Sequence, residues 1–463
     1  MVAVLLWLDA CAIGTTPPAA VSPSASISGA SSPSPVSSPS STPTSQFADW
    51  PQYHRNALRT GLGPSVPALA SPRAAWNRSL DGKVYASPVI VGGRVIAATE
   101  NNTVFALDLV TGAVVWRKHL GTPVDARTLP CGNIGPVTGI TGTPAADPAT
   151  GELFVVAFLA GYHHVLFTLS LGDGSVRRTL GVDPAGSVPA VQQQRPALTL
   201  TPAHVYIAYG GLAGDCGAYH GYIVGVPRAG GATAIYRTPA ARESGFWTPM
   251  GVTVSDTGVV YAVTGNGSIS SSFDYSNSVL QLSPGLKLQA YFAPSNWREL
   301  DASDADLGSV GAAFLPAVGA VVAIGKNGIA YVLSASRLGG IGGQLAAARV
   351  CAGAWGGSSW VGTRVLLPCS DGLVAVDVTG TSMSLAWRVG GVRTASPIVA
   401  AGAVWAVDVD SATLFALDLG SGSVLYRLPL GSSQHFSTPA ATNGYVVTPA
   451  GSAIVAVAVA PPA

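Results

Sequence analysis

Charged residues are scarce in this 463-residue chain: Asp, Glu, Lys and Arg make up 10% of it, against about 25% in an ordinary soluble domain. The net charge is +1, and no stripe of Lys or Arg is present. Nucleic-acid binding depends on neutralising many phosphates, so this class of partner is not supported. Hydrophobic residues reach 48% and glycines number 56, a composition that suits sheets packed on both faces.

Long apolar runs and several catalytic motifs are also missing. Beyond the N-terminus no run of about 18 apolar residues occurs, so we expect no transmembrane helix. The sequence has no Cys-x-x-Cys-His, which excludes a built-in c-type haem. Nothing in it resembles a Ser/His/Asp nucleophile set, a phosphate loop or a zinc site.

The first 46 residues have the character of an export signal followed by a tether. Residues 1–11 are largely apolar, and Leu8-Asp9-Ala10-Cys11 resembles a bacterial lipoprotein box. Residues 12–46 are mostly Ser, Pro, Thr and Ala, cannot bury a core, and predict a disordered tether. The resemblance implies a lipidated Cys11, membrane anchoring, and a location at the bacterial cell surface or in the periplasm. Asp9 and the lack of a basic residue before the apolar run depart from the lipoprotein pattern. A misplaced start codon would explain the lack of a basic residue. The alternative to lipidation is that Cys11 is incidental.

The stretch from Ala86 to Trp116 is a repeating unit of four short strands. A Ser-Pro opens it, and Gly-Gly, Asn-Asn and Thr-Gly turns separate its strands. The strand at 103–109 alternates apolar and polar residues, and no helical period is present. These are strand and hairpin signals.

The same unit returns along the chain, marked by the dipeptide that opens it. The openings are Ser87-Pro88, Thr143-Pro144, Arg195-Pro196, Thr248-Pro249, Ser309-Val310, Ser358-Ser359, Ser396-Pro397 and Thr438-Pro439. Their spacing of about 40 to 60 residues is the period of propeller-like arrays. The last unit has only three strands, and the strand that contains Trp76 supplies the fourth. Residues 47–463 therefore predict an all-β, eight-bladed β-propeller of four-stranded antiparallel blades, with the last blade closed by an N-terminal strand.

Four cysteines follow Cys11, an even number that suggests two disulfides in an exported protein. Cys351 ends an outer strand and Cys369 ends the second strand of the next unit, so both lie on the same rim. We therefore expect a Cys351–Cys369 disulfide, with Cys131 and Cys216 joined across two long loops on that rim. Free buried thiols are the alternative.

Two stretches show a resemblance to the PQQ-type (pyrroloquinoline quinone) repeat. They are Phe105-Ala106-Leu107-Asp108…Thr111-Gly112…Val115-Trp116 and Phe415-Ala416-Leu417-Asp418…Gly422. In that family the Trp docks neighbouring blades; Trp116 and Trp387 hold its place here, and Arg177 and Tyr426 replace it in other units. The resemblance covers nearly everything from residue 73 on. It implies the fold but not the function, because the repeat occurs in quinoprotein dehydrogenases, outer-membrane assembly lipoproteins and propellers of unknown role.

Four insertions, 121–142, 210–221, 265–277 and 293–308, interrupt the regular pattern. Each joins the second and third strands of a unit or one unit to the next, and both kinds of connection emerge on one face of a propeller. Long loops on one face of a rigid scaffold usually form a binding site.

The third to fifth blades resemble quinoprotein alcohol dehydrogenases more closely. The matching segments, in order, are Gly210-Gly211…Asp215…His220-Gly221-Tyr222, Phe246-Trp247…Thr264-Gly265-Asn266-Gly267, Asp301-Ala302-Ser303-Asp304-Ala305-Asp306 and Gly325-Lys326-Asn327-Gly328. The resemblance implies that Trp247 stacks under PQQ and that Lys326 contacts the quinone. The implied ligands of a calcium or lanthanide ion are Asp215, Asn266, Asp304 and Asp306. Asp304 would also be the catalytic base.

The sequence departs from that pattern in several places. Cys131 has no adjacent cysteine, Ser303 stands where the family has Trp, Gly267 replaces a Pro, and His220 replaces an Arg. Each matching residue also has a structural alternative: a core position for Trp247, a solvated turn or structural calcium loop for the aspartates, and a hairpin turn for Lys326.

Two functions from different classes therefore remain. One is an exported, membrane-tethered binding or scaffold propeller that presents its irregular loop face to a protein, glycan or cell-wall partner. The other is a PQQ- and metal-dependent alcohol or sugar dehydrogenase that passes electrons to a separate acceptor. The tether, the missing haem and the missing adjacent cysteines favour the first. The ordered run of Asp215, Trp247, Asn266, Asp304 and Lys326 favours the second.

Overall fold

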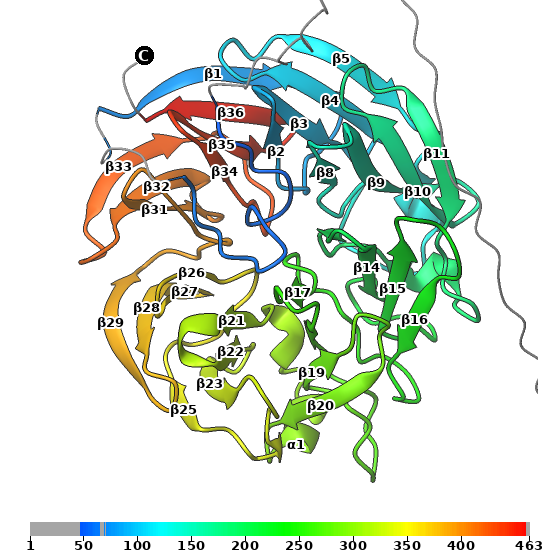
Figure 1. Cartoon of the computed structure of the whole chain (residues 1–463), viewed down its shortest axis with the longest axis vertical. Coiled ribbons are helices and arrows are strands. Elements are labelled where there is room, and N and C mark those ends of the chain that lie inside the picture. Colours follow the sequence, from blue (N-terminus) through cyan, green and yellow to red (C-terminus); the bar gives the residue numbers. More distant parts are fainter. Residues whose placement is uncertain (1–46, 65–68, 70, 460–463) are drawn as a thin grey trace, which may run out of the picture. The chain divides into compact units, whose positions relative to one another are not determined.

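The computed structural model describes residues 47–64, 69 and 71–459, so Cys11 and the expected tether lie outside the described residues. Eight sheets surround a central channel, and seven of them follow one another in chain order (Figure 1). Each sheet has a four-stranded antiparallel core, so the predicted eight-bladed propeller is confirmed. Among the described residues, no helix combines the length and apolarity needed to cross a bilayer.

The first four blades follow the order of the chain. Blade 1 consists of β2 (Val89–Val91), β3 (Arg94–Ala98), β4 (Thr103–Asp108) and β5 (Val114–His119). Blade 2 consists of β8 (Ala145–Asp147), β9 (Glu152–Leu159), β10 (His163–Ser170) and β11 (Val176–Gly181). Blade 3 consists of β12 (Gln192–Gln193), β13 (Thr199–Leu200), β14 (His204–Gly211), β15 (Tyr222–Pro227) and β16 (Ala234–Arg237). Blade 4 consists of β17 (Thr253–Val254), β18 (Val260–Val263), β19 (Val279–Leu282) and β20 (Leu288–Ala293), with β24 (Gly340–Ile341) added in parallel at its edge.

The second half of the ring repeats this plan. Blade 5 consists of β21 (Ala313–Leu315), β22 (Ala320–Ile324), β23 (Ile329–Ser334) and β25 (Ala346–Arg349). Blade 6 consists of β26 (Ser359–Val361), β27 (Arg364–Cys369), β28 (Gly372–Val378) and β29 (Met383–Gly390). Blade 7 consists of β30 (Ile398–Ala400), β31 (Ala403–Asp408), β32 (Thr413–Asp418) and β33 (Val424–Pro429). Blade 8 consists of β34 (Ala440–Thr442), β35 (Tyr445–Ala450), β36 (Ala453–Ala458) and β1 (Arg73–Ser79).

The ring is closed by the N-terminal strand, as the sequence predicts. Strand β1 pairs antiparallel with β36, and Trp76 lies opposite Ala456. This pairing completes blade 8 with its fourth strand and ties the two ends of the propeller together.

Burial follows the position of a strand in its blade. In blade 1, β4 is buried along almost its whole length, because both of its faces pack against neighbouring blades. The outer strand β5 exposes four of its six residues and buries Trp116. The small Ala, Val and Gly residues that dominate the composition therefore serve the contacts between sheets, and the few charges lie mainly at edges and turns.

The channel contains a segment whose course the sequence does not reveal, which we call the inner segment (residues 47–63). Its main chain bonds to the innermost strands of successive blades: Trp50 to Ile90 of blade 1 in both directions, at 2.7 and 2.9 Å, and Gly61 to Val399 of blade 7 at 2.7 Å. Further bonds join it to blades 2, 3, 4, 6 and 8. The inner segment therefore circles the channel and closes it between the two faces of the ring (Figure 1).

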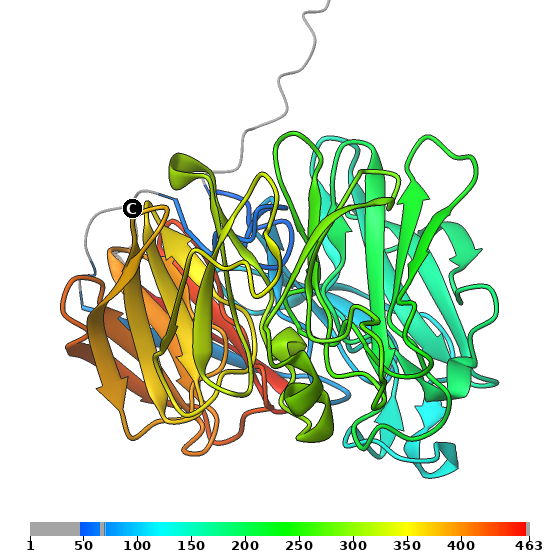
Figure 2. The ribbon, with the colours of Figure 1, turned by 90° about the horizontal axis from the view of Figure 1, so that it is seen from below.

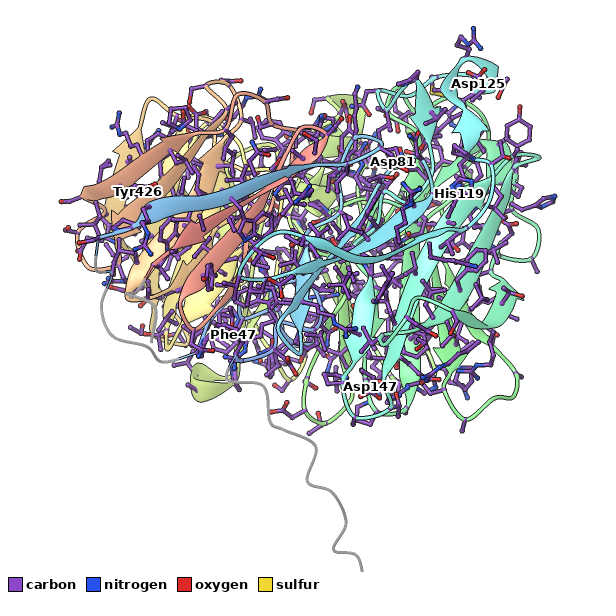
Figure 3. All side chains as sticks on the ribbon, turned by 90° about the horizontal axis from the view of Figure 1, so that it is seen from above. Phe47, Asp81, His119, Asp125, Asp147 and Tyr426 are labelled. Carbon is purple, nitrogen blue, oxygen red and sulfur yellow. A yellow bond between two sulfur atoms is a disulfide. The ribbon has the colours of Figure 1, made fainter. Side chains whose placement is uncertain are left out.

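The two faces of the propeller differ. Figure 3 places Asp125, in the insertion 121–142, on one face, and Phe47 and Asp147 on the other. We call the first the loop face, because all four insertions connect either β-strands two and three of a blade or one blade to the next. The inner segment begins on the opposite face, which carries the short hairpin turns (Figure 2).

The loop face also carries most of the remaining regular structure. The insertion 121–142 holds β6 (Val124–Asp125), η1 (Ala126–Thr128) and β7 (Val137–Thr138). The only α-helix of the described residues, α1 (Trp297–Ala302), lies in the insertion 293–308, followed by η3 (Leu307–Ser309). Two further 3-10 turns are η2 (Pro189–Val191) and η4 (Pro316–Val318).

Candidate functional site

A cavity of about 580 Å³ opens between blades near the centre of the ring. It is built from segments that connect neighbouring blades and from the loops of blades 6 and 7. Its wall residues are Asn133, Arg195, Trp247, Trp355, Cys369, Ser370, Arg393, Thr394, Ala395, Val409, Ser433, Gln434, His435 and Phe436. This size suits a small-molecule ligand, and the mixture of aromatic rings and a few polar groups is typical of such sites. We call it the central cavity.

Arg195 is the cation of the central cavity that lacks a carboxylate partner. Its guanidinium donates to Asn133 Oδ1 at 3.2 Å and lies 5.4 Å from the centre of the Phe436 ring. Among the described residues no carboxylate lies within ion-pair distance of it, although the buried Glu100 carboxyl acts on its charge from farther away. Burial lowers the pKa of Arg195, although an arginine remains charged at neutral pH. An arginine in this condition favours a bound anion.

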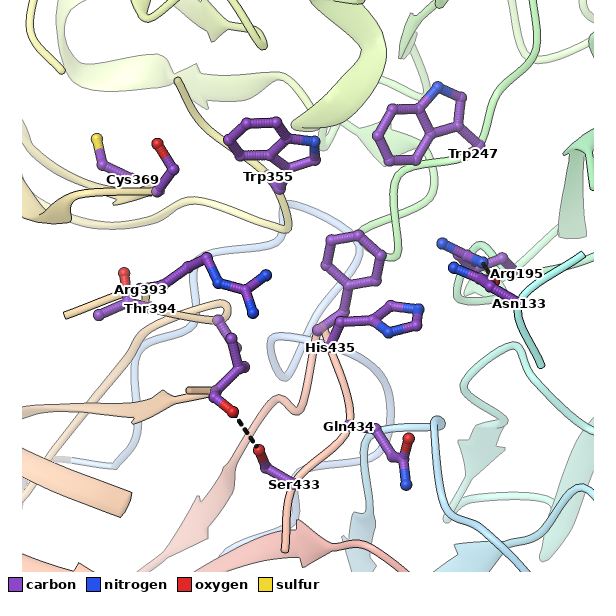
Figure 4. A pocket seen from close by; sticks show the side chains of 14 residues that line it. Asn133, Arg195, Trp247, Trp355, Cys369, Arg393, Thr394, Ser433, Gln434 and His435 are labelled. Atoms are coloured by element: carbon purple, nitrogen blue, oxygen red, sulfur yellow. Dashed lines mark hydrogen bonds between the residues drawn. The ribbon is translucent and has the colours of Figure 1, made fainter. Parts of the chain in front are cut away.

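Two further basic side chains border the cavity, Arg393 and His435. Figure 4 shows Arg195 and Arg393 on opposite sides of the cavity, with His435 between them. Arg393 donates to Asp410 and is therefore neutralised. Burial, followed by the charges of Arg195, Arg393 and Lys83, lowers the pKa of His435 to about 4. His435 is thus neutral at physiological pH, and its Nε2 has no hydrogen-bond partner within the described part of the chain.

Beside the cavity lies a second cluster, made of residues that the sequence analysis singled out. The Lys326 ammonium is 2.7 Å from Asp304 Oδ1 and 2.6 Å from Asp306 Oδ2. The other oxygen of Asp306 accepts from Trp247 Nε1 at 3.2 Å and from the Asn266 main-chain N at 2.7 Å. The lysine also lies 5.5 Å from the Trp247 ring centre. Trp247 therefore belongs to both the cavity wall and this acidic cluster.

The cluster forms a buried ion pair. Burial raises the pKa of Asp306 to about 6, against the opposing effect of Lys326. For Lys326, burial acts to lower the pKa, but the two carboxylates outweigh it and raise the pKa above its ordinary value. Asp306 is buried, whereas the Asp304 side chain is 62% exposed. The Lys326–Asp306 contact is thus the structural centre of the cluster, with Asp304 at its edge.

Neither of the two remaining predicted metal ligands pairs with Lys326 among the described residues. Asp215 accepts a 2.5 Å hydrogen bond from the Tyr219 hydroxyl, and Asn266 enters the cluster through its main-chain N–H. The carboxylate oxygens of Asp215, Asp304 and Asp306 do not all lie close enough to one another to bind a single metal ion, as far as the described residues show.

The fit of the two implied cofactors can be judged from these contacts. A cation between Asp304 and Asp306 would have to displace the ammonium of Lys326, so the ligand set is not arranged for a metal in this structure. For a quinone, the indole of Trp247 is available on the cavity wall, but Lys326 is not part of that wall. The metal and quinone roles of these residues therefore remain predictions.

Asp301, the first aspartate of the segment 301–306, has a structural role. It accepts from Gly267 N and Asn277 Nδ2 at 2.8 Å each and from Ser276 Oγ at 2.9 Å. These bonds fasten the insertion 265–277 to helix α1. Asp301 is therefore a buried acceptor that positions the loop, and not part of a solvated turn.

Both predicted disulfides are present, Cys131–Cys216 and Cys351–Cys369. Cys369 also lines the central cavity, and Cys131 lies two residues before Asn133, another wall residue. The two crosslinks therefore hold loops on opposite sides of the cavity mouth. Cys11 lies outside the described residues.

Several wall residues escaped the sequence analysis, namely Arg195, Trp355, Arg393, His435 and Phe436. One signal was available, because Arg195-Pro196 stands where the other complete openings have Ser-Pro or Thr-Pro. The other complete openings place a small hydroxyl side chain near the channel axis. At this opening the arginine introduces a positive charge at the centre of the ring.

Close to the cavity, Glu100 makes the stability of the protein depend on pH. Its side chain is buried, and Oε2 accepts from Gly139 N at 2.7 Å and from Thr141 Oγ1 at 3.2 Å, whereas Oε1 has no partner among the described residues. Burial raises its pKa to about 7. The folded state therefore holds a proton that the unfolded state releases near pH 4.5, so stability is lost as the pH rises from about 4.5 to about 7.

We expect Glu100→Gln to remove this loss. Two and a half pKa units correspond to about 3.4 kcal/mol over the whole titration, of which about 2.5 kcal/mol falls between pH 5 and pH 8. Urea unfolding at both pH values measures the free energy of unfolding of each protein. The wild type should lose about 2.5 kcal/mol more than the Gln variant over this range, and parallel pH profiles would show that Glu100 does not titrate as described.

One protein-family model matches part of this sequence. The model of the family described as outer membrane protein assembly factor BamB matches residues 63–208. The predicted PQQ-type repeat is therefore confirmed in that part of the chain. No curated protein matches the sequence.

Solved structures extend the likeness of fold to most of the chain. The quinohemoprotein alcohol dehydrogenase ADHIIG from Pseudomonas putida HK5 superposes with a TM-score of 0.71 at 14% identity, covering 90% of this chain and 81% of that one. A europium-containing methanol dehydrogenase gives 0.66 at 14% identity, covering 86% and 89%. BamB from Moraxella catarrhalis gives 0.57 at 12% identity, covering 85% and 99%. At these identities the similarity establishes the propeller fold and leaves the function to the site.

Proposed function

We propose that this chain is an exported binding propeller, tethered to a membrane through Cys11, that takes an anionic, ring-bearing ligand into the central cavity. The observation that carries the proposal is the Arg195 guanidinium, which lines the cavity without a carboxylate partner and stacks on Phe436. A carboxylate, sulfonate or phosphate on the ligand would complete its hydrogen bonds. The Lys326–Asp306 ion pair satisfies the neighbouring charges internally, so the surplus positive charge lies at Arg195.

The aromatic walls fit the second part of the ligand. Trp247, Trp355 and Phe436 offer faces on which a sugar or aromatic ring can lie. The volume of about 580 Å³ accommodates a ligand of about disaccharide size. An acidic glycan of the cell envelope has this chemistry, which agrees with a role at the cell surface.

The placement of the inner segment supports tethering. The chain enters the described propeller at Phe47, on the face opposite to the insertion that carries Asp125 (Figure 3). A tether that joins the ring on that side leaves the loop face accessible to a partner. The two disulfides are consistent with an extracytoplasmic location.

A pair of fluorescent probes tests the proposal. 8-Anilinonaphthalene-1-sulfonate (ANS) carries a sulfonate, and N-phenyl-1-naphthylamine is the same ring system without the charge. We expect ANS to bind the purified protein at one site at least tenfold more tightly than the neutral probe, because only ANS satisfies Arg195. Equal affinities, or the absence of a saturable ANS site, would contradict an anion-binding cavity.

A dehydrogenase remains the second candidate, because Trp247, Lys326, Asp304 and Asp306 do lie together. PQQ, when bound, would accept two electrons from an alcohol, and Trp247 would lie against its ring. Loading with PQQ and calcium or a lanthanide, followed by dye reduction with simple alcohols, tests this candidate. Alcohol-dependent reduction that is lost in Asp304→Ala would support it, and no bound PQQ at high concentration would exclude it.

A further inference from the structure

Three junctions between blades are filled by a tryptophan in the same way. The indoles of Trp76, Trp116 and Trp387 each pack on a glycine in the turn before the outer strand of the next blade. A Cβ added at Gly112, Gly174 or Gly422 would come within 2.6, 2.6 and 2.8 Å of these rings. Each indole N–H donates to a main-chain oxygen three residues before that glycine, that of Leu109, Leu171 or Leu419, at 2.8, 3.1 and 3.0 Å. These contacts define an indole slot with one carbonyl acceptor.

The junction between blades 2 and 3 has the slot but no tryptophan. Arg178 lies opposite Thr168 at the register where Trp116 lies opposite Ala106, each next to a β-bulge. The docking position of blade 2 is therefore Arg178, and the assignment to Arg177 is wrong by one residue. The Arg178 side chain is 55% exposed and lies 3.7 Å from Glu152, so its guanidinium does not fill the junction.

The empty slot is visible as a cavity of about 280 Å³. A Cβ added at Gly230 or Gly231, in the corresponding turn of blade 3, would meet no atom within 4 Å. The wall combines apolar side chains, among them Phe154, Leu166 and Val226, with three threonines and two arginines. The guanidinium of Arg228 lies 5.7 Å from the centre of the Phe154 ring. The space is thus pre-formed and open, unlike the three occupied slots.

The carbonyl acceptor of the slot is also in place. Leu109 N donates to Gly93 O and Leu171 N donates to Gly151 O, in each case to the residue before the second strand of the blade. Arg228 N donates in the same way to Ala203 O, which precedes β14. The carbonyl of Arg228 therefore occupies the position that accepts an indole N–H at the other junctions.

We propose that the cavity between blades 2 and 3 binds an indole ring, either as a free indole-type molecule or as the side chain of a tryptophan from a peptide. The ring packs between Phe154, Leu166 and Val226, and its N–H donates to the Arg228 carbonyl. The site is independent of the central cavity and of its anionic ligand.

The test uses ¹⁹F NMR of 5-fluoroindole added to the full-length protein. We expect saturable binding that falls at least tenfold in Arg178→Trp, because the new indole fills the slot. Arg177→Trp is the matched control, because Arg177 does not line this cavity and donates to Thr150 O, and it should leave the affinity unchanged. Trp116→Ala should create a second site of the same kind at the junction of blades 1 and 2.

Two further probes sharpen the assignment. 1-Methyl-5-fluoroindole lacks the N–H and should bind about fivefold more weakly, in keeping with one lost neutral hydrogen bond. N-acetyl-5-fluorotryptophanamide carries main-chain groups: its binding indicates a peptide-borne indole, and its exclusion while 5-fluoroindole binds indicates a free ligand. If Arg178→Trp does not fold, Thr168→Leu reduces the same space from the opposite wall. No saturable binding of either ring, or binding insensitive to Arg178→Trp and Thr168→Leu, would overturn the proposal.

Discussion

Replacing Arg59 by Ala should lower the free energy of unfolding by about 3–5 kcal/mol, the largest effect that we expect from a single substitution in this chain. The side chain is fully buried in the channel. It donates to Tyr53 O at 2.8 Å, Leu198 O at 3.1 Å and Val252 O at 3.3 Å, and to Thr199 Oγ1 at 2.5 Å. No carboxylate is among these partners, so one guanidinium satisfies acceptors from the inner segment and from blades 3 and 4. Truncation removes this donor from the buried oxygens of Tyr53 and Leu198, whereas Val252 O still accepts from the Thr199 hydroxyl at 2.8 Å.

Urea denaturation followed by tryptophan fluorescence measures this effect. Arg55→Ala is the matched control, because Arg55 belongs to the same segment but its side chain makes one exposed hydrogen bond within the described residues, to Leu62 O. We expect the control to change the free energy of unfolding by less than about 0.5 kcal/mol. Equal effects of the two substitutions would mean that the inner segment is not fastened through Arg59. A large difference would show that the inner segment is part of the folded propeller.

Arg195→Gln should weaken ANS binding by about 10- to 100-fold while leaving the neutral naphthylamine probe unchanged. The substitution removes a charge-assisted hydrogen bond of about 1.5–3 kcal/mol and leaves a shorter, uncharged polar side chain. The neutral probe depends on the aromatic walls, which the substitution does not alter. The difference between the probes therefore isolates the contribution of the guanidinium charge.

Arg195→Lys provides a second level of control. It keeps the charge but loses the planar fork, so we expect ANS affinity between those of the wild type and the Gln variant. If both probes lose affinity together in Arg195→Gln, the substitution has disturbed the cavity walls and the charge is not the determinant. Unchanged affinity for ANS would place the anion site elsewhere.

The propeller itself could be predicted from the sequence because its signals are local. The turn residues and the opening dipeptides mark each blade independently. Six of the eight openings stand shortly before the first strand of a blade, whereas Ser359 begins β26 and Arg195-Pro196 lies between β12 and β13. Closure through the strand that contains Trp76 followed from a count of strands, and its pairing with β36 confirms it. Disulfide partners were also predictable, since the repeat fixes which rim each cysteine reaches.

The inner segment and the central cavity could not be predicted in the same way. The contacts of the inner segment join residues far apart in sequence, such as Gln52 with Leu200. No periodic pattern in the sequence predicts these contacts. The cavity gathers single residues from many connections, so neighbours in space, such as Arg195 and Phe436, share no motif. The resemblance to quinoproteins instead drew attention to Asp304 and Lys326, which neutralise each other beside the cavity.

The one-residue error at the junction of blades 2 and 3 was avoidable from the sequence. Trp116 stands four residues after Gly112, and the residue four after Gly174 is Arg178. Both strands carry a β-bulge at the same register, so the paired strands place Arg178 where blade 1 has Trp116.

The position of a bound anionic ring tests the proposed function most directly. A crystal of the protein soaked with a brominated derivative of ANS reports the ligand through the anomalous signal of bromine. We predict the bromine peak in the cavity bounded by Trp247, Trp355 and Phe436, with the sulfonate at the guanidinium of Arg195. A peak outside this cavity, or a sulfonate directed to Lys326 with Asp304 and Asp306 displaced, would contradict an anion site built on Arg195.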